Sequence, residues 1–291
     1  MTGIQKLMCV VALLFSLSGV SQKASSEHVE KVFEEIYSFN LHQADSLIAK
    51  YQGESNDPTW DLLQANVAWW HLLSGELEDE HWNEVFDTEL KSTLAKTEDS
   101  DVLQDRFYSI LVRAFRARHE LMHDNYLSGL NQLNNCVDEI TDSFDSEREY
   151  KSFLLTSGLY YYFMGKAYEE YFILRPYLIF YPDGDMAKGI DYLEQMAARD
   201  ELFSRVEARY FLMRIYLDVE KDYKLALKYN ELLLQEFPDN LFYQLLRLRI
   251  AKRAGDMDAL KALKPAYKQH LNSRKDLSEA QRKYFSRIPS A

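Results

Sequence analysis

Residues 207–238 indicate the fold most clearly, and they read EARYFLMRIYLDVEKDYKLALKYNELLLQEFP. Tyr210 and Met213 begin an apolar face at helical spacing, and a second apolar run follows after a short polar break. The small side chain of Ala226 lets two helices approach closely, and Pro238 ends the second helix because it lacks an amide hydrogen. The stretch therefore predicts two antiparallel helices.

The spacing of these residues resembles that of the tetratricopeptide repeat, a helix pair of about 34 residues. Arg214 departs from the family pattern, which prefers a small residue there. Further units show the same register, in which a residue inside the first helix and a turn residue lie seven apart: Ala68 and Gly75, Gly158 and Gly165, Leu248 and Gly255. The resemblance implies an all-α chain, an α-α superhelix of about five to six helix pairs.

We expect one tetratricopeptide-like domain over residues 22–291. The helix pairs are predicted at about 28–52, 59–97, 101–141, 147–200, 203–236 and 239–272, and a last helix at about 276–286 is expected to cap the exposed end. Composition agrees, because 47% hydrophobic residues can form a large core and only 10 Gly and 6 Pro disfavour a turn-rich β-fold.

The central pair carries an insertion at Lys166–Asp183, since its first helix is predicted to end near Gly165 and its second to start near Gly184. Long insertions between packed elements are often functional, and this one is apolar. The Tyr/Phe-rich helix followed by this insertion resembles secreted tetratricopeptide-like proteins of Gram-negative bacteria, of the Bacteroidetes type. That resemblance implies a compartment and a scaffold, not a reaction.

The N-terminus has the pattern of a signal peptide, because Lys6 precedes an apolar run from Leu7 to Leu17 that is too short to span a bilayer. Cleavage is expected after Ser21, which predicts a periplasmic or secreted protein with no transmembrane segment in the mature chain. Cys9 precedes most of the apolar run, so it is not read as a lipidation site. The remaining cysteine, Cys136, is expected to be a small buried side chain.

The net charge of the chain and its distribution limit the kinds of partner that it can bind. The net charge of −12 argues against a nucleic-acid partner, which needs basic protein surface. Residues 241–291 nevertheless carry 12 Lys or Arg against 4 Asp or Glu. These charges either decorate solvated helix faces or dock an acidic surface, including that of another copy of the chain.

One motif points to catalysis. His119, Glu120 and His123 match H-E-x-x-H, in which two histidines bind zinc and the glutamate activates a water. Arg116 and Arg118 bring positive charge to this site, and no second motif supplies a third ligand. A zinc-dependent peptidase is therefore kept as the alternative, and no cofactor is predicted for the main hypothesis.

The main hypothesis is a non-enzymatic scaffold that binds another protein or a peptide. In stacked repeats the first helix of each pair lines the concave face, and Tyr, Trp and Arg are frequent anchors of interfaces. Tyr160, Tyr161 and Phe163 are expected in the core. The candidate binding residues are five on the concave face and two in the insertion: Trp69, Arg118, Tyr162, Phe211 and Asp218, with Tyr177 and Tyr181.

Overall fold

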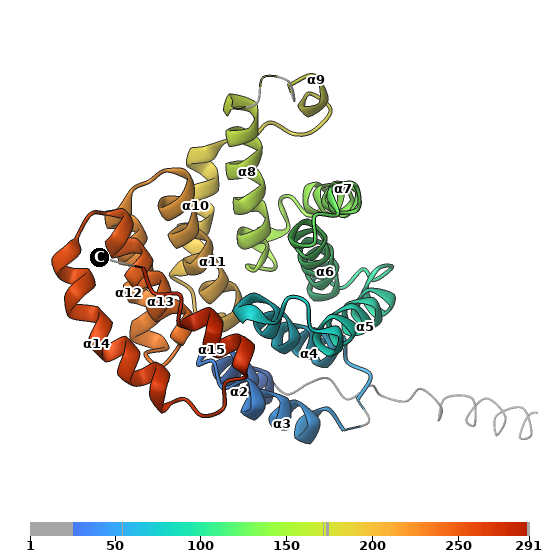
Figure 1. The fold of residues 1–291 in the computed structure, drawn as a ribbon. Helices are drawn as coiled ribbons and strands as arrows, with labels where there is room; N and C mark the ends of the chain where they lie inside the picture. Colours follow the sequence, from blue (N-terminus) through green and yellow to red (C-terminus); the bar gives the residue numbers. More distant parts are fainter. Residues whose placement is uncertain (1–25, 54, 171, 173–174, 290–291) are drawn as a thin grey trace, which may run out of the picture.

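The structure is a computed structural model that describes residues 26–53, 55–170, 172 and 175–289. In these residues the chain is all-α, and helices pack in neighbouring pairs that follow one another as a superhelix, which confirms the predicted fold class (Figure 1). The pairs are α2 (Ser26–Tyr37) and α3 (Leu41–Gln52), α4 (Pro58–His71) and α5 (Glu80–Thr97), α6 (Leu103–Met122) and α7 (Tyr126–Asp142), α8 (Phe153–Glu170) and α10 (Met186–Ala197), α11 (Leu202–Arg214) and α12 (Tyr223–Glu236), α13 (Leu241–Arg253) and α14 (Met257–Ser273).

The predicted signal peptide, residues 1–21, lies outside the described residues. None of the helices that are described combines the length and the apolar character needed to cross a bilayer.

Local sequence explains where half of the described α-helices begin. Seven of them start after a residue whose side chain accepts a hydrogen bond from a backbone N–H of the first turn, which satisfies a donor that the helix leaves free. These capping residues are Asp57, Asp79, Asp185, Asp222, Asn240, Asp256 and Ser278.

Glycines bring the fourth pair together, as the sequence predicts for Gly158. A Cβ on Gly158 would lie 3.1 Å from the carbonyl oxygen of Gly189, and one on Gly189 would lie 2.5 Å from the backbone nitrogen of Tyr162. The backbones of α8 and α10 therefore touch where a larger residue would hold them apart.

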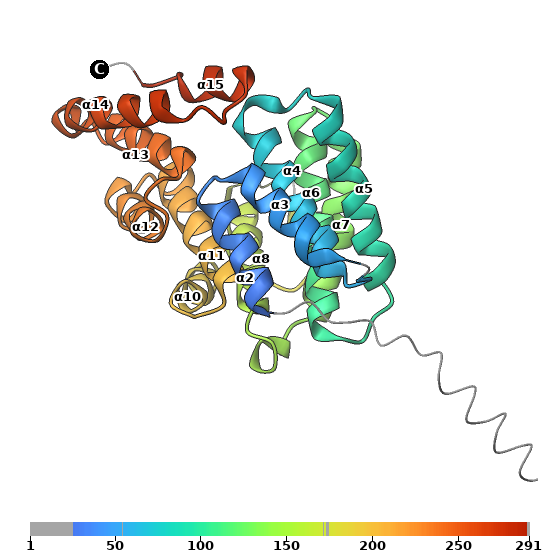
Figure 2. The ribbon, with the colours of Figure 1, turned by 90° about the horizontal axis from the view of Figure 1, so that it is seen from below.

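The last helix, α15 (Glu279–Phe285), occupies the predicted position and begins with a capping box formed by Ser278 and Gln281. It packs on α13 and on η1 (Leu72–Glu76), the turn that follows α4 (Figure 2). Gly75 in that turn has a φ of +115°, and a Cβ on it would lie 2.8 Å from Cβ of Tyr284. The C-terminal helix thus covers a turn of the second pair, not only the end of the last pair.

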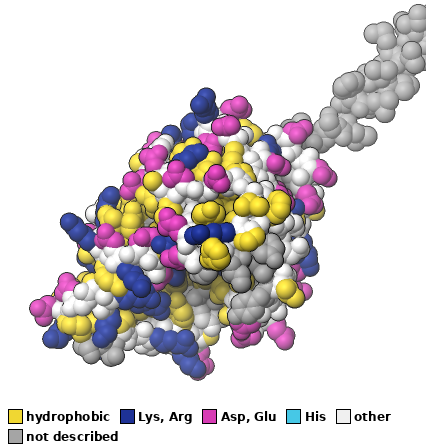
Figure 3. All heavy atoms as spheres, turned by 90° about the horizontal axis from the view of Figure 1, so that it is seen from above, with side chains coloured by type: hydrophobic (Ala, Val, Ile, Leu, Met, Phe, Trp, Pro, Cys, Tyr) yellow, Lys and Arg dark blue, Asp and Glu magenta, His cyan; other side chains and the backbone are white. Residues whose placement is uncertain are grey.

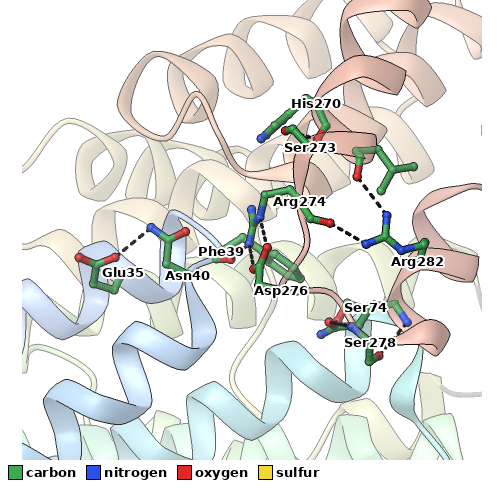
Figure 4. A network of polar contacts seen from close by, with 12 residues as sticks. Glu35, Phe39, Asn40, Ser74, His270, Ser273, Arg274, Asp276, Ser278 and Arg282 are labelled. Carbon is green, nitrogen blue, oxygen red and sulfur yellow. Dashed lines mark hydrogen bonds and ion pairs between the residues drawn. The ribbon is translucent and has the colours of Figure 1, made fainter.

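Contacts between the two ends of the chain close the superhelix on itself. Asn240 Nδ2 donates to the carbonyl oxygen of Tyr37 (2.7 Å), and Arg274 Nη2 donates to that of Phe39 (2.6 Å; Figure 4). Phe39 has a φ of +62°, which belongs to the tight turn between α2 and α3. Arg282 in turn donates to the carbonyl oxygen of Arg274 (2.6 Å). The first pair is therefore held by the caps of the last pair, since Asn240 begins α13 and Arg274 follows α14.

The insertion differs from its prediction at its start. α8 continues past Gly165 to Glu170, and a connection over residues 171–185, with the short helix α9 (Arg175–Leu178), leads to α10. Lys166 pairs with Glu170 one turn later (3.2 Å), an i,i+4 contact that supports the extra helical turn. Pro182 and Tyr181 tie the end of the connection to Tyr160 on α8 and Asn134 on α7, and none of its described side chains lines the concave pocket described next. Figure 1 shows α9 beyond the end of α8.

Candidate functional site

A cavity of about 230 Å³ lies between the first helices of three consecutive pairs. α6 contributes Arg118, α8 contributes Phe163, and α11 with the turn η4 (Ile215–Val219) contributes the remaining wall. We call it the concave pocket; it is lined by Arg118, Phe163, Tyr210, Phe211, Arg214, Ile215, Asp218 and Val219. Three of the five residues predicted for the concave face, Arg118, Phe211 and Asp218, meet here.

The wall from α11 follows from helical spacing. Phe211, Arg214 and Asp218 lie three and four positions apart, so they share one face of the helix and of the turn that extends it. This face also includes Glu207, one turn before Phe211. The sequence therefore places a carboxylate, an aromatic ring, a guanidinium and a second carboxylate in one row.

Arg118 is the cation that remains available in the pocket. Its guanidinium lies over the ring of Trp69, 4.9 Å from the ring centroid, and it has no ion-pair partner in the described part of the chain. Trp69 is itself only 3% exposed and packs on Phe86 and Phe115, with ring centroids 5.4 and 5.5 Å away. The ring of Trp69 thus fixes the position of the Arg118 guanidinium at the wall of the pocket.

The other two charged side chains of the pocket, Arg214 and Asp218, form an ion pair with each other. Arg214 Nε donates to Asp218 (2.6 Å), and Arg214 Nη1 donates to the Tyr210 hydroxyl (2.9 Å). Arg253 of α13 also donates to Asp218. Burial opposes ionisation of Asp218, but the hydrogen bonds and charges of Arg214 and Arg253 outweigh it and lower its pKa. Asp218 is therefore a stable anion that fixes Arg214.

Glu207 is the unusual acid of this face. Burial raises its pKa to about 7, while the Tyr37 hydroxyl, which donates to Oε1 (3.0 Å), and the charge of Arg118 act in the opposite direction. Strongly raised carboxyl pKa values often mark functional sites, although structural networks also produce them. Through its hydrogen bond with Tyr37, Glu207 also joins α11 to α2. The face of α11 that lines the pocket is thus connected to the first helix pair.

Three of the aromatic assignments need revision in the structure. Trp69, predicted as a binding residue of the concave face, is 3% exposed and lies under Arg118. Tyr162 is 1% exposed, and its hydroxyl donates to Glu220 (2.5 Å), so it is a packing residue with a satisfied polar end. Phe163, predicted to be core, is 46% exposed and lines the pocket, so that prediction is wrong. Tyr160 is buried as expected, and Tyr161 is half-buried. A consecutive aromatic run covers every side of a helix, so its spacing alone does not distinguish the exposed ring.

Tyr181, the insertion tyrosine whose side chain is described, does not line the concave pocket. The hydroxyl of Tyr181 donates to Oδ1 of Asn134 on α7, so it tethers the connection to that helix. The side chain of Tyr177 lies outside the part of the chain that the structure describes. Sequence reasoning missed Tyr210 and Arg214 as pocket residues, although both follow from the spacing of Phe211 and Asp218.

The H-E-x-x-H motif straddles the end of α6, which stops at Met122 and leaves His123 at the C-cap with φ −97° and ψ 16°. His119 Nε2 is hydrogen-bonded to Oδ1 of Asn83 (2.7 Å). Burial lowers the pKa of His119, and His123, whose ring centroid is 4.6 Å away, lowers it further. Within the described ranges, no three His, Cys, Asp or Glu side chains are grouped so as to hold a metal ion.

Cys136 is buried, as the sequence predicts, and its Sγ lies 3.6 Å from the carbonyl oxygen of Ile110. Burial raises the pKa of its thiol to about 12. A thiol with such a pKa stays protonated at neutral pH, so Cys136 is a packing residue that joins α7 to α6.

Comparisons of the chain with protein-family models, with curated proteins and with solved structures find no match. Its function is therefore inferred from the geometry of the site.

Proposed function

We propose that this protein is a non-enzymatic scaffold, periplasmic or secreted, that binds a peptide or a segment of another protein in the concave pocket. The observation that carries the proposal is the Arg118 guanidinium, which forms no salt bridge among the described residues, although its charge acts on Glu207, and which lines the pocket together with Phe163 and Phe211. Its position on first helices supports it, because stacked helix pairs bind segments along this face.

The pocket indicates the chemistry of the ligand. Arginine binds carboxylates through two parallel N–H groups, and Arg118 is held in place for this by the ring of Trp69. Phe163 and Phe211 offer apolar surface next to that cation. The proposed ligand therefore presents a carboxylate, either an acidic side chain or a C-terminus, beside a large apolar side chain.

The size of the pocket favours a peptide over a compact small molecule. Its volume of about 230 Å³ is below the roughly 300–1,000 Å³ of sites that enclose drug-sized ligands. One or two side chains fit, so the rest of the ligand would run along the surface, as a chain segment does.

Selection from a library of random peptides displayed on phage tests the proposal. Against the purified protein, we expect enrichment of peptides with a carboxylate next to an aromatic or aliphatic residue. The enriched peptides should bind Arg118→Ala and Phe211→Ala about tenfold or more weakly, the usual effect of removing an interface anchor.

Lys224→Ala is the matched control, because Lys224 is an exposed cation on α12 outside the pocket. Its variant should bind the selected peptides as the wild type does. Peptides that bind Arg118→Ala as tightly as the wild type would contradict a role for this pocket.

A further inference from the structure

A second cavity lies at the insertion. It has a volume of about 740 Å³ and is bounded by the C-terminal half of α8, residues 178–185 of the connection and the first turn of α10. None of its lining residues lines the concave pocket. Its apolar lining residues include Met164, Tyr168, Leu178, Ile179 and Met186. We call it the insertion cavity.

The floor of this cavity is fixed by backbone contacts. A Cβ on Gly184 would lie 2.0 Å from the backbone nitrogen of Gly165, so the returning chain lies directly on α8. The N–H of Asp185 donates to the carbonyl oxygen of Tyr161 (3.0 Å), and the Tyr160 hydroxyl donates to that of Pro182 (2.7 Å). These contacts fix the returning chain against α8.

Large apolar side chains around the cavity face solvent. Phe172, Ile179 and Phe180 are 78%, 69% and 81% exposed. Arg175 lies over the rings of Tyr168 and Phe172, at 4.7 and 5.3 Å from their centroids. Figure 3, which looks onto this side of the molecule, shows hydrophobic side chains gathered around a basic one. Exposed apolar patches of this kind mark interaction surfaces.

The area of the patch argues against a second copy of the chain as the occupant. Three aromatic-sized side chains at these exposures offer roughly 400 Å². A stable protein–protein interface needs about 800 Å² on each partner. The exposed patch formed by Phe172, Ile179 and Phe180 therefore suits a narrow occupant, such as a linear segment that enters the cavity.

Charge decides the chemistry of that segment. The charged side chains that line the cavity are Glu169, Asp183 and Asp185, and no Lys, Arg or His among the described residues lines it. Oδ1 of Asp185 already accepts the N–H of Lys188 at the start of α10. Glu169 and Asp183 are exposed and remain for a ligand cation, while the basic side chain of the patch, Arg175, lies over the rings of Tyr168 and Phe172.

We propose that the insertion cavity binds a linear segment of another protein in which a lysine or arginine adjoins large apolar side chains. The apolar side chains fill the cavity between Met164, Ile179 and Met186, and the cation lies between Glu169 and Asp183. The site is separate from the concave pocket and has the opposite preference for ligand charge. Either site can fail its test without the other.

The probe for this proposal is a fluorescein-labelled synthetic peptide of alternating leucine and lysine, measured by fluorescence anisotropy on the full chain. The double variant Glu169→Lys/Asp183→Lys should weaken binding about tenfold or more, and Ile179→Ser/Phe180→Ser should do the same. All four positions are solvent-exposed, so circular dichroism should show that the variants fold.

Glu34→Lys/Glu84→Lys is the matched control, because it reverses two exposed carboxylates outside the cavity, on α2 and α5. Its binding should change less than about twofold; an equal loss would show non-specific attraction and overturn the proposal. A probe with serine in place of leucine that binds equally well would overturn it too. Sedimentation of the protein with phosphatidylcholine vesicles, if Phe180→Ser abolishes it, would also overturn the proposal, because the patch would then be a lipid contact.

Discussion

Replacing Glu207 by glutamine removes a charge that the fold tolerates poorly. Burial raises the pKa of Glu207 from its ordinary 4.5 to about 7, so the folded state binds a proton that the unfolded chain has already lost over this range. Because the folded pKa is raised, the stabilising contribution of this carboxyl is complete below pH 4.5 and is lost as the pH rises towards 7.

The magnitude follows from the same values. Each pH unit between the two pKa values corresponds to about 1.36 kcal/mol, so the ionised carboxylate costs the folded protein at most about 3 kcal/mol above pH 7. Glutamine keeps an acceptor for the Tyr37 hydroxyl, which is 3.0 Å from Oε1 of Glu207, but it carries no charge. Glu207→Gln should therefore become progressively more stable than the wild type as the pH rises.

Urea denaturation followed by tryptophan fluorescence measures this difference at pH values from about 5 to 8. The free energy of unfolding of Glu207→Gln minus that of the wild type should increase by about 2–3 kcal/mol over the range. Glu34→Gln removes the same charge from the exposed face of α2 and serves as the control. A difference for Glu207→Gln that stays constant with pH would refute the reasoning.

Three further outcomes are expected. Gly189→Ala should destabilise the protein by about 3 kcal/mol or more in thermal or urea unfolding, because its Cβ would lie 2.5 Å from the backbone of Tyr162; a normal stability would contradict this packing. Tyr162→Phe should cost about 1–2 kcal/mol, since it removes the hydrogen bond to Glu220, and no change would mean that this bond contributes nothing. Cys136, with its pKa raised to about 12, should react with a thiol reagent at pH 8 only after denaturation; rapid reaction of the native protein would contradict its burial.

Much of the fold is predictable because it is encoded locally. Apolar spacing and end signals such as Pro238 locate the helix pairs, and the small size of Gly158 predicts the close contact that α8 makes with α10. The extra turn of α8 was missed, although Lys166 and Glu170 are spaced to form an i,i+4 ion pair. Local sequence patterns of this kind predict only the contacts within one helix pair.

The closure of the superhelix has no such local signal. Asn240 looks like an ordinary helix cap, which it is, yet its amide also donates to the carbonyl oxygen of Tyr37 from the first pair. Arg274 likewise has nothing in its neighbourhood that predicts its bond to the backbone of Phe39. These contacts join residues about 200 positions apart, and only the accumulated curvature of the pairs brings them together.

The candidate site is predictable only in part, because it too depends on contacts between helix pairs. The register of first helices brings Arg118, Phe211 and Asp218 to one pocket, but it gives no measure of how deeply a side chain is covered. Trp69 therefore lies beneath the pocket, at 3% exposure, and Phe163 lies in it at 46%. The burial of a side chain depends on the residues that neighbouring helix pairs pack against it. Helical spacing within one segment carries no information about those residues.

The central claim is that a partner segment binds in the concave pocket. Site-specific photo-cross-linking tests it most directly, with benzoylphenylalanine in place of Phe211 in the pocket or of the exposed Gln235 on α12. In cells that produce the protein, we predict a discrete cross-linked partner from position 211 that Arg118→Ala removes, and none from position 235. The same products from both positions, or products at 211 that Arg118→Ala leaves unchanged, would contradict the claim.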